Sequence, residues 1–259
     1  MKMTVKLKFF VLLALGMLLL CGFSGRDPVE DMEEFIFELT KYTKRVEGKK
    51  YIALTFDDGP NMISTPLLLD ILDETNVKAT FFVLGELAEQ FPDVIKRMAE
   101  AGHEIGNHSY KHLELPTLSK TKIASQLDYT NLCLLDITGK RPRLMRPPFG
   151  SVNKNVVSVA SEKDMAVILW TIDPKDWLIT NSAAIANKVI KNAEDGAIVL
   201  LHDAHKPSAL AAKAIIEELK KQDFEFLTVS DLIHMDRGLE FGAVYKDSKG
   251  TIDKWKTSR

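Results

Sequence analysis

The sequence is poor in several features that would place it in a specialised class of proteins. Cysteine occurs only at Cys21 and Cys133 in 259 residues. Because Cys21 lies in an N-terminal segment outside the predicted fold, we predict no disulfide in the mature domain and interpret Cys133 as a small core residue. No stretch rich in proline, serine or glycine divides the chain, so we expect one domain although the length would allow two.

An excess of charge of one sign is missing as well. The 34 lysines and arginines nearly balance the 36 aspartates and glutamates, which gives a formal net charge of −2. This balance provides no strongly basic surface, and we therefore expect no nucleic-acid partner. A hydrophobic content of 46% and a charged content of 27% are those of ordinary globular proteins.

A long apolar run does occur at the N-terminus, from Phe9 to Leu20, after three lysines and before several small residues. This pattern is typical of a secretory signal peptide, which we assign to residues 1–25. An uncleaved membrane anchor is the first alternative. Lipidation at Cys21 is another, although the bulky Leu20 before it is unusual for such a signal. Under each of these interpretations the domain is exported to the extracellular space, the cell wall or the outer face of the cytoplasmic membrane. We expect membrane contact only through this N-terminal segment.

The rest of the chain alternates between predicted strands and helices. Residues 26–48 predict a helical spacer, and residues 238–259 a tail that forms a hairpin. Between them, the predicted strands are 51–56, 77–83, 103–106, 143–146, 165–172, 197–201 and 224–227, and the predicted helices begin near 64, 92, 119, 152, 182, 209 and 229. Alternation in units of roughly thirty residues predicts parallel βαβ connections. With one strand fewer than a complete (β/α)₈ barrel, we expect a single α/β domain with a distorted, incomplete (β/α)₇ barrel.

Polar residues follow the predicted strands at the point where each strand ends. They are Asp57 and Asp58, His108 and His112, Arg146, Asp173 and Asp176, and His202 with Asp203. In a parallel barrel the carboxyl ends of all strands lie at one face, so these groups should converge although they span about 150 positions.

The spacing of His108 and His112 would place both rings on one side of a helical turn, close enough to share a metal ion. With Asp58 they form a set of two histidines and one carboxylate, which suits Zn²⁺. The same set also suits a non-haem Fe(II) oxygenase, so the ligand types alone leave the chemistry open. A metal here would also offset the repulsion between Asp57 and Asp58.

His202 ends a fully apolar strand and is either a core histidine or a general acid or base, with Asp176 as a candidate to hold it protonated. Arg146 precedes two prolines and would orient Asp57 through a bidentate pair or form a structural ion pair. The isolated histidines are expected in turns and at the surface: His103, His205 and His234.

Five segments in a fixed order complete the pattern: Thr55–Gly59, His108-x-x-x-His112, Arg146–Gly150, Asp173-x-x-Asp176-Trp177 and Leu200-x-His202. In this order they resemble the motifs of the polysaccharide deacetylases, carbohydrate esterase family 4, among them bacterial peptidoglycan and chitooligosaccharide N-deacetylases. The resemblance spans about residues 50–235 and implies a distorted barrel with a catalytic domain at 49–237. Leu113 stands where the family usually has proline, and Phe149 where tyrosine is common.

The resemblance also implies roles. Asp58, His108 and His112 would bind one divalent ion, Zn²⁺ first, with Co²⁺, Ni²⁺ or Mn²⁺ as alternatives. Asp57 would be the general base for the water on that ion, and Arg146 would orient it. His202 would protonate the leaving amine, and Asp176 would tune His202.

On the substrate side, the resemblance implies that the backbone N–H of Phe149 helps to stabilise the oxyanion. Trp177 and Leu200 would line the slot for the acetyl methyl group.

The expected function is hydrolysis of the linear amide C–N bond of N-acetylglucosamine-type residues in a polysaccharide, peptidoglycan first, by a monomer. Chitooligosaccharides and O-acetylated polysaccharides of the xylan type are the alternative substrates. A glycan-binding envelope protein with an inactive site is a further alternative. Glycosidic hydrolysis fits poorly, because glycosidases hold their two carboxylates across the bond, about 5 Å or more apart, whereas Asp57 and Asp58 are adjacent.

Overall fold

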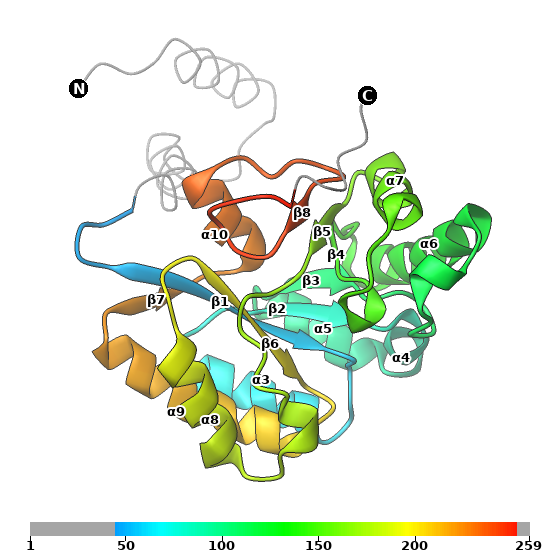
Figure 1. Cartoon of the computed structure of the whole chain (residues 1–259). Coiled ribbons are helices and arrows are strands. Elements are labelled where there is room, and N and C mark those ends of the chain that lie inside the picture. Colours follow the sequence, from blue (N-terminus) through cyan, green and yellow to red (C-terminus); the bar gives the residue numbers. More distant parts are fainter. Residues whose placement is uncertain (1–44, 253–259) are drawn as a thin grey trace, which may run out of the picture. The chain divides into compact units, whose positions relative to one another are not determined.

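The computed structural model of the chain describes residues 45–252 (Figure 1). The expected signal peptide or anchor at 1–25 and most of the expected spacer at 26–48 lie outside these residues. Among the helices of the described part, none is both long and apolar enough to cross a membrane.

The sheet curls into an incomplete barrel. Its strands are β1 (Lys50–Asp57), β2 (Thr80–Val83), β3 (Glu104–Asn107), β4 (Leu144–Met145), β5 (Ala166–Ile168), β6 (Ala197–His202), β7 (Phe224–Phe226) and β8 (Val244–Tyr245). The order is β6-β1-β2-β3-β4-β5-β8, with β7 beside the start of β1, and every pairing of these strands is parallel. Single bridges join Ile172 to Val199 and Asp247 to Ala197, so the last strands bend back toward β6. The expected α/β fold with an incomplete barrel is confirmed.

Helices surround the curled sheet, and all but the last lie on its outside (Figure 1). They are α3 (Ser64–Glu74), α4 (Gly85–Gln90), α5 (Pro92–Glu100), α6 (Lys120–Thr138), α7 (Lys154–Glu162), α8 (Ser182–Asn192), α9 (Lys206–Lys221) and α10 (Val229–Asp236). The last helix packs at the end of the barrel where β2 and β3 begin. Successive helices pack on each other in the order of the strands beneath them, as α8 on α9, α9 on α3, and α5 on α6.

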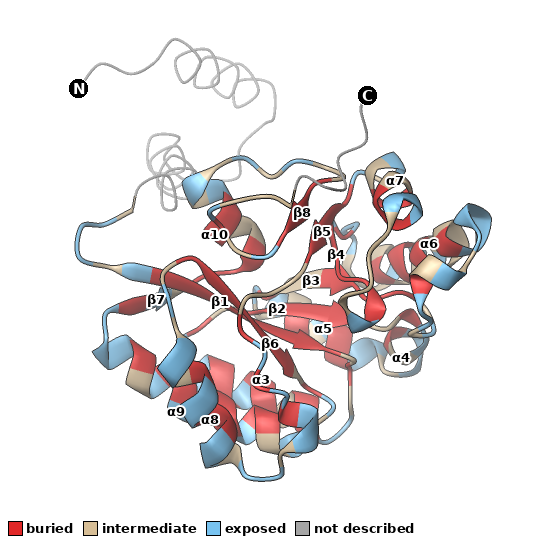
Figure 2. Cartoon of the chain, viewed as in Figure 1, coloured by how far each residue is buried: buried red, intermediate tan, exposed pale blue. Residues whose placement is uncertain are grey.

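The central strand shows why the core lies where it does. After Lys50 every residue of β1 is buried (Figure 2), because the strand has helices on one face and the barrel interior on the other. Ile52, Leu54 and Phe56 belong to the core shared with the outer helices. Side chains alternate along a strand, so Thr55 and Asp57 lie on the opposite face, toward the interior.

Helix boundaries follow local signals in several places. Ser119 caps α6 by accepting a hydrogen bond from the backbone of Lys122, and Gly139 ends the helix in the left-handed conformation at φ 72°. The tail, where the sequence predicts a hairpin, contributes β8 to the sheet beside β5, and Tyr245 and Thr251 form an antiparallel bridge.

Candidate active site

The first predicted motif forms a sharp turn at the end of β1. Asp57 is the last residue of the strand and is 3% exposed. Asp58 follows with φ 70°, in the left-handed region that residues with a Cβ rarely adopt. Because the backbone turns sharply at Asp58, the two adjacent carboxylates point in different directions. Asp57 points toward Arg146, and Asp58 points toward the histidines after β3.

Arg146 is the buried centre of the site. Its side chain is 0% exposed, and Nη1 donates to Asp57 Oδ1 (2.8 Å) and to Thr55 Oγ1 (2.6 Å). Nε and Nη2 donate to the carbonyl oxygens of Ile168 (3.2 Å) and Leu169 (3.0 Å). The expected bidentate pair with Asp57 is therefore wrong, because these carbonyls occupy the other guanidinium nitrogens. Arg146 instead ties Asp57 to the backbone of β5.

Asp58, His108 and His112 converge as predicted. Asp58 Oδ1 lies 3.2 Å from Nε2 of each histidine, and one ligand atom from each residue falls within 4.8 Å of the others. Burial alone would raise the pKa of Asp58, but the two nearby imidazoles, when they are protonated, outweigh it and hold this pKa well below its usual range. Asp58 Oδ1 is buried without a hydrogen-bond partner, which marks an oxygen placed for another cation.

The ring of His108 has a defined orientation. Its Nδ1 lies 2.7 Å from the backbone oxygen of Arg146. Since a carbonyl oxygen can only accept, Nδ1 carries the proton and Nε2 keeps its lone pair for a metal. Two imidazole nitrogens and an ionised carboxylate form a donor set that suits a divalent ion such as Zn²⁺. The residues present therefore fit the metal that the sequence motifs imply.

The predicted helical turn between His108 and His112 is wrong. The segment is a loop in which Ser109 (φ 68°) and His112 (φ 53°) are both left-handed. Ser109 N donates to Asn107 Oδ1 (2.7 Å), and His112 N donates to Ser109 Oγ (3.1 Å). These bonds fold the loop tightly enough to bring the two rings within 5.1 Å between centroids.

His202 and Asp176 form a second pair at the same face. His202 Nδ1 is 2.7 Å from Asp176 Oδ1, and the backbone N–H of His202 donates to Oδ2 (2.8 Å). Burial opposes a charge on His202, but the hydrogen bond and charge of Asp176, helped by Asp57 and Asp58, outweigh it and raise the pKa of His202 to about 9. His202 Nε2 lies 4.0 Å from Asp58 Oδ2, so the protonated ring borders the metal-ligand cluster.

The predicted substrate-side residues lie around this face in different environments. Phe149 is 67% exposed, is left-handed at φ 61°, and packs edge-on against His112 with centroids 4.6 Å apart. Trp177 directly follows Asp176 and is also exposed, whereas Leu200 is buried two residues before His202. Their roles toward a substrate remain predictions.

Sequence reasoning assigned no role to two residues that support the site. Thr55 receives a hydrogen bond from Arg146, and Ser208 donates to Asp176 Oδ2. The alternation of β1 could have identified Thr55, which shares a face with Asp57. Nothing in the first turn of α9 indicates Ser208. Asp173 is exposed, and its carboxylate accepts from the backbone of Lys175 instead.

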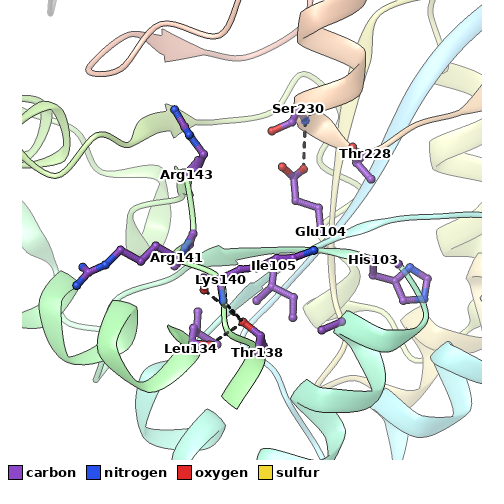
Figure 3. Close-up of a pocket in the computed structure, with 13 residues that line it drawn as sticks. His103, Glu104, Ile105, Leu134, Thr138, Lys140, Arg141, Arg143, Thr228 and Ser230 are labelled. Carbon is purple, nitrogen blue, oxygen red and sulfur yellow. Dashed lines mark hydrogen bonds between the residues drawn. The ribbon is translucent and has the colours of Figure 1, made fainter. Parts of the chain in front are cut away.

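A cavity of about 310 Å³ lies at the opposite end of the barrel (Figure 3). It is lined by the starts of β3 and α10 and by the segment before β4, and it contains none of the predicted site residues. His103 borders it. The expectation that His103 is a surface residue is wrong, because its side chain is 6% exposed and Nδ1 accepts from the backbone of Ala79.

Comparison with known proteins assigns a family to this arrangement. The polysaccharide deacetylase family model matches residues 44–168, which include Asp57, Asp58, His108, His112 and Arg146. The peptidoglycan-N-acetylglucosamine deacetylase PgdA of Listeria monocytogenes is 42% identical over 78% of this chain. The chain spans 42% of the length of PgdA, which is less than half of that relative.

One further relative and one solved structure are matched over most of the length of the relative or of the solved chain. A peptidoglycan-N-acetylglucosamine deacetylase of Bacillus cereus is 40% identical over 72% of this chain and 89% of the relative. The solved structure of peptidoglycan deacetylase PdaC from Bacillus subtilis is 40% identical, with a TM-score of 0.70 over 74% of this chain and 93% of that one. From its curled sheet, its cluster of one aspartate and two histidines and these similarities, we conclude that the chain belongs to the polysaccharide deacetylase family.

Proposed function

We propose that this protein is a hydrolase that removes N-acetyl groups from peptidoglycan with the help of one divalent metal ion. The observation that carries the proposal is the meeting of Asp58, His108 and His112 beside Asp57 and His202 at one face of the barrel. Metal ligands, a base and an acid around one point are what the proposed reaction needs, and this arrangement supports the proposal. The peptidoglycan substrates named for PgdA and for the Bacillus cereus relative support the choice of polymer.

Asp58, His108 and His112 would hold the ion, Zn²⁺ in the first place. When bound, it would supply Lewis-acid polarisation of the acetyl carbonyl and lower the pKa of a water molecule toward ~7. The proton transfers are carried out by residues of the chain itself.

Asp57 is the proposed general base. Its Oδ1 is held by Arg146, while Oδ2 lies 3.8 Å from His108 Nε2 and so faces the ligand cluster. Oδ2 therefore takes the proton from the water as the oxygen attacks the acetyl carbon. Arg146 fixes the direction of this carboxylate, because its other nitrogens are anchored to the backbone of β5.

His202 is the proposed general acid. Asp176 holds its Nδ1, so Nε2 carries the proton that the leaving nitrogen needs when the C–N bond breaks to give acetate and a free amine. Asp176 is itself fixed by Ser208 and by the backbone of His202. The backbone N–H of Phe149 would donate to the oxyanion, where a lost donor costs about 3–4 kcal/mol in known enzymes.

Trp177 and Leu200 are the proposed walls of the slot for the acetyl methyl group. They lie on the two segments that bring Asp176 and His202 together, next to the pair that would act on the leaving nitrogen. We further propose that the protein is exported through its N-terminal segment and works as a monomer on the cell wall.

Acetate release from N-acetylated peptidoglycan and from chitin oligomers tests the proposal. The full-length protein is stripped with a chelator and reloaded with Zn²⁺, and the His234→Ala variant serves as a control because His234 is exposed at the other end of the barrel. Chelator-sensitive release that Zn²⁺ restores, faster with peptidoglycan, is the expected result. Metal-loaded protein without release from either polymer would overturn the proposed reaction.

The polymer product of the same reaction identifies which sugar loses its acetyl group. The curated relatives are named for two different sugars. PdaC is called a peptidoglycan-N-acetylmuramic acid deacetylase, and PgdA is called a peptidoglycan-N-acetylglucosamine deacetylase. We propose N-acetylglucosamine for this chain, because the Bacillus cereus relative covered over 89% of its length carries that name. Mass spectrometry of the digested product reports which sugar has lost its acetyl group, and loss from muramic acid would contradict this choice.

A further inference from the structure

Asp203 is a buried carboxylic acid beside the site that the proposed reaction does not use. Its side chain is 0% exposed, Oδ2 accepts a hydrogen bond from Thr65 Oγ1 (2.6 Å), and Oδ1 is buried without a partner. Its backbone N–H donates to the carbonyl oxygen of Asp57 (3.2 Å). Burying a carboxyl group with one oxygen left unpaired costs free energy, so we asked which contacts of Asp203 offset this cost.

The carboxyl group lies directly against the turn that carries the two aspartates. A Cβ built at Gly59 would fall 2.1 Å from Asp203 Oδ2, 2.3 Å from Oδ1 and 2.5 Å from Cγ. The φ of Gly59 is not positive, so the backbone itself would accept alanine. Glycine is therefore required at this position by the close approach of Asp203.

A chain of hydrogen bonds extends this contact to the other side of the turn. The backbone N–H of Asn61 donates to Thr65 Oγ1 (2.7 Å), whose hydroxyl donates in turn to Asp203. Asp203 thus connects the end of β1, the loop after it and the first turn of α3. Asp58 stands between these points in the left-handed conformation, which persists only where surrounding contacts impose it.

We propose that Asp203 is a positioning residue that holds the Asp57–Asp58 turn in the shape required for metal binding. The inference rests on the proposed function, since it concerns the same ligand set. Burial raises the pKa of Asp203 to about 7, and the charges of Asp58 and Asp57 act in the same direction.

The test measures Zn²⁺ affinity of the metal-free full-length protein by chelator competition, alongside thermal stability and kcat and KM for acetate release. Asp203→Ala is expected to weaken Zn²⁺ binding on the order of 10-fold or more and to lower kcat more than it raises KM. Asp203→Asn, which keeps the shape and an acceptor for Thr65, is expected to restore affinity close to that of the unmodified protein. Thr65→Val keeps the packing volume but removes the hydroxyl that donates to Asp203 and accepts from the backbone of Asn61, and it is expected to give a milder loss than Asp203→Ala.

A double variant tests the contact itself. Gly59→Ala is expected to weaken Zn²⁺ binding, whereas Gly59→Ala combined with Asp203→Ala should bind Zn²⁺ more tightly than Gly59→Ala alone, because the three clashing atoms are gone. A general loss of stability in the single variants would not produce this recovery of Zn²⁺ affinity in the double variant. If the double variant binds no better than Gly59→Ala, the proposed contact is refuted.

Two controls separate the possible failures. Asp231→Ala removes an acid that also accepts from a threonine hydroxyl, that of Thr228, but on α10 at the far end of the barrel, and should lower stability without changing Zn²⁺ affinity. Asp58→Ala should abolish tight binding. If Asp58→Ala still binds Zn²⁺ tightly, the proposed metal site is wrong. If Asp58→Ala loses Zn²⁺ while Asp203→Ala only lowers stability, the metal site stands and the positioning role is overturned.

Discussion

His108 and Arg146 are joined through the Nδ1 atom of the histidine and the backbone oxygen of the arginine, which lie 2.7 Å apart. The side chain of the same arginine binds Asp57. One residue at the end of β4 therefore orients both a candidate metal ligand and the candidate base. Any displacement of this strand end would move His108 and Asp57 together, which keeps their relative positions constant.

Asp57→Asn is expected to keep Zn²⁺ bound and to lose most activity, by roughly 100-fold or more in kcat, since an amide cannot take the proton. Its shape preserves the contact with Arg146 Nη1. Metal content and acetate release, measured on the same preparation, check this result. Full activity in this variant would rule out Asp57 as the base.

His112→Ala is expected to weaken Zn²⁺ binding strongly, because it removes one of three protein ligands. His103→Asn is a suitable control, since His103 is equally a histidine but is buried beside Phe81 at the opposite end of the barrel. Competition with a chromophoric chelator measures both affinities. Equal affinities in the two variants would be incompatible with the proposed ligand set.

Arg146→Met is expected to destabilise the protein by about 3–5 kcal/mol, because it leaves the buried carboxylate of Asp57 without its partner. Arg143→Met is the matched control, since Arg143 is exposed and lies over the ring of Phe241. Urea denaturation gives the two unfolding free energies. A loss for Arg146→Met no larger than that of the control would show that Arg146 contributes no essential ion pair.

The pair of His202 and Asp176 predicts a pH-dependent stability. The pKa of His202 is about 9 in the folded protein, above the value near 6.5 of an unfolded chain, so its contribution is fully present below about pH 6.5 and is lost as pH rises through 9. At its maximum this contribution is roughly 3 kcal/mol. The unfolding free energy of the metal-free protein, compared with His202→Gln in chelator between pH 6 and 10, should show the difference shrinking over that interval. A difference that stays constant with pH would contradict the raised pKa.

The sequence predicted the fold and the meeting of the polar residues because both depend on regular patterns. Alternating strands and helices require parallel pairing, and parallel pairing brings the strand ends to one face. Asp58 and His108 therefore could be placed together without any knowledge of distances. Helix α6 was predictable at both ends because Ser119 and Gly139 act locally.

Features that depend on tertiary contacts were not predictable. Helix α4 has no side-chain cap and begins at Gly85, where a Cβ would meet Thr130 and Tyr110 at 2.5–2.6 Å, so packing rather than propensity defines its start. His112 is left-handed without being glycine, since Ser109 holds its backbone. The two residues of β8 are too few to show a pattern, and only their pairing with β5 reveals them as a strand.

The neighbouring positions of β1 and β6 have a consequence for how the protein acquires its activity. Thr55 Oγ1 donates to the backbone oxygen of Val199 across 144 positions of sequence, and the same pairing brings Asp57 level with His202. The proposed base belongs to an early part of the chain and the proposed acid to a late one. A ribosome-bound chain that ends before β6 would hold every proposed metal ligand yet could not protonate a leaving group. The proposed catalysis therefore requires the long-range pairing of β1 with β6, whereas the proposed metal ligands all precede β6 in the chain.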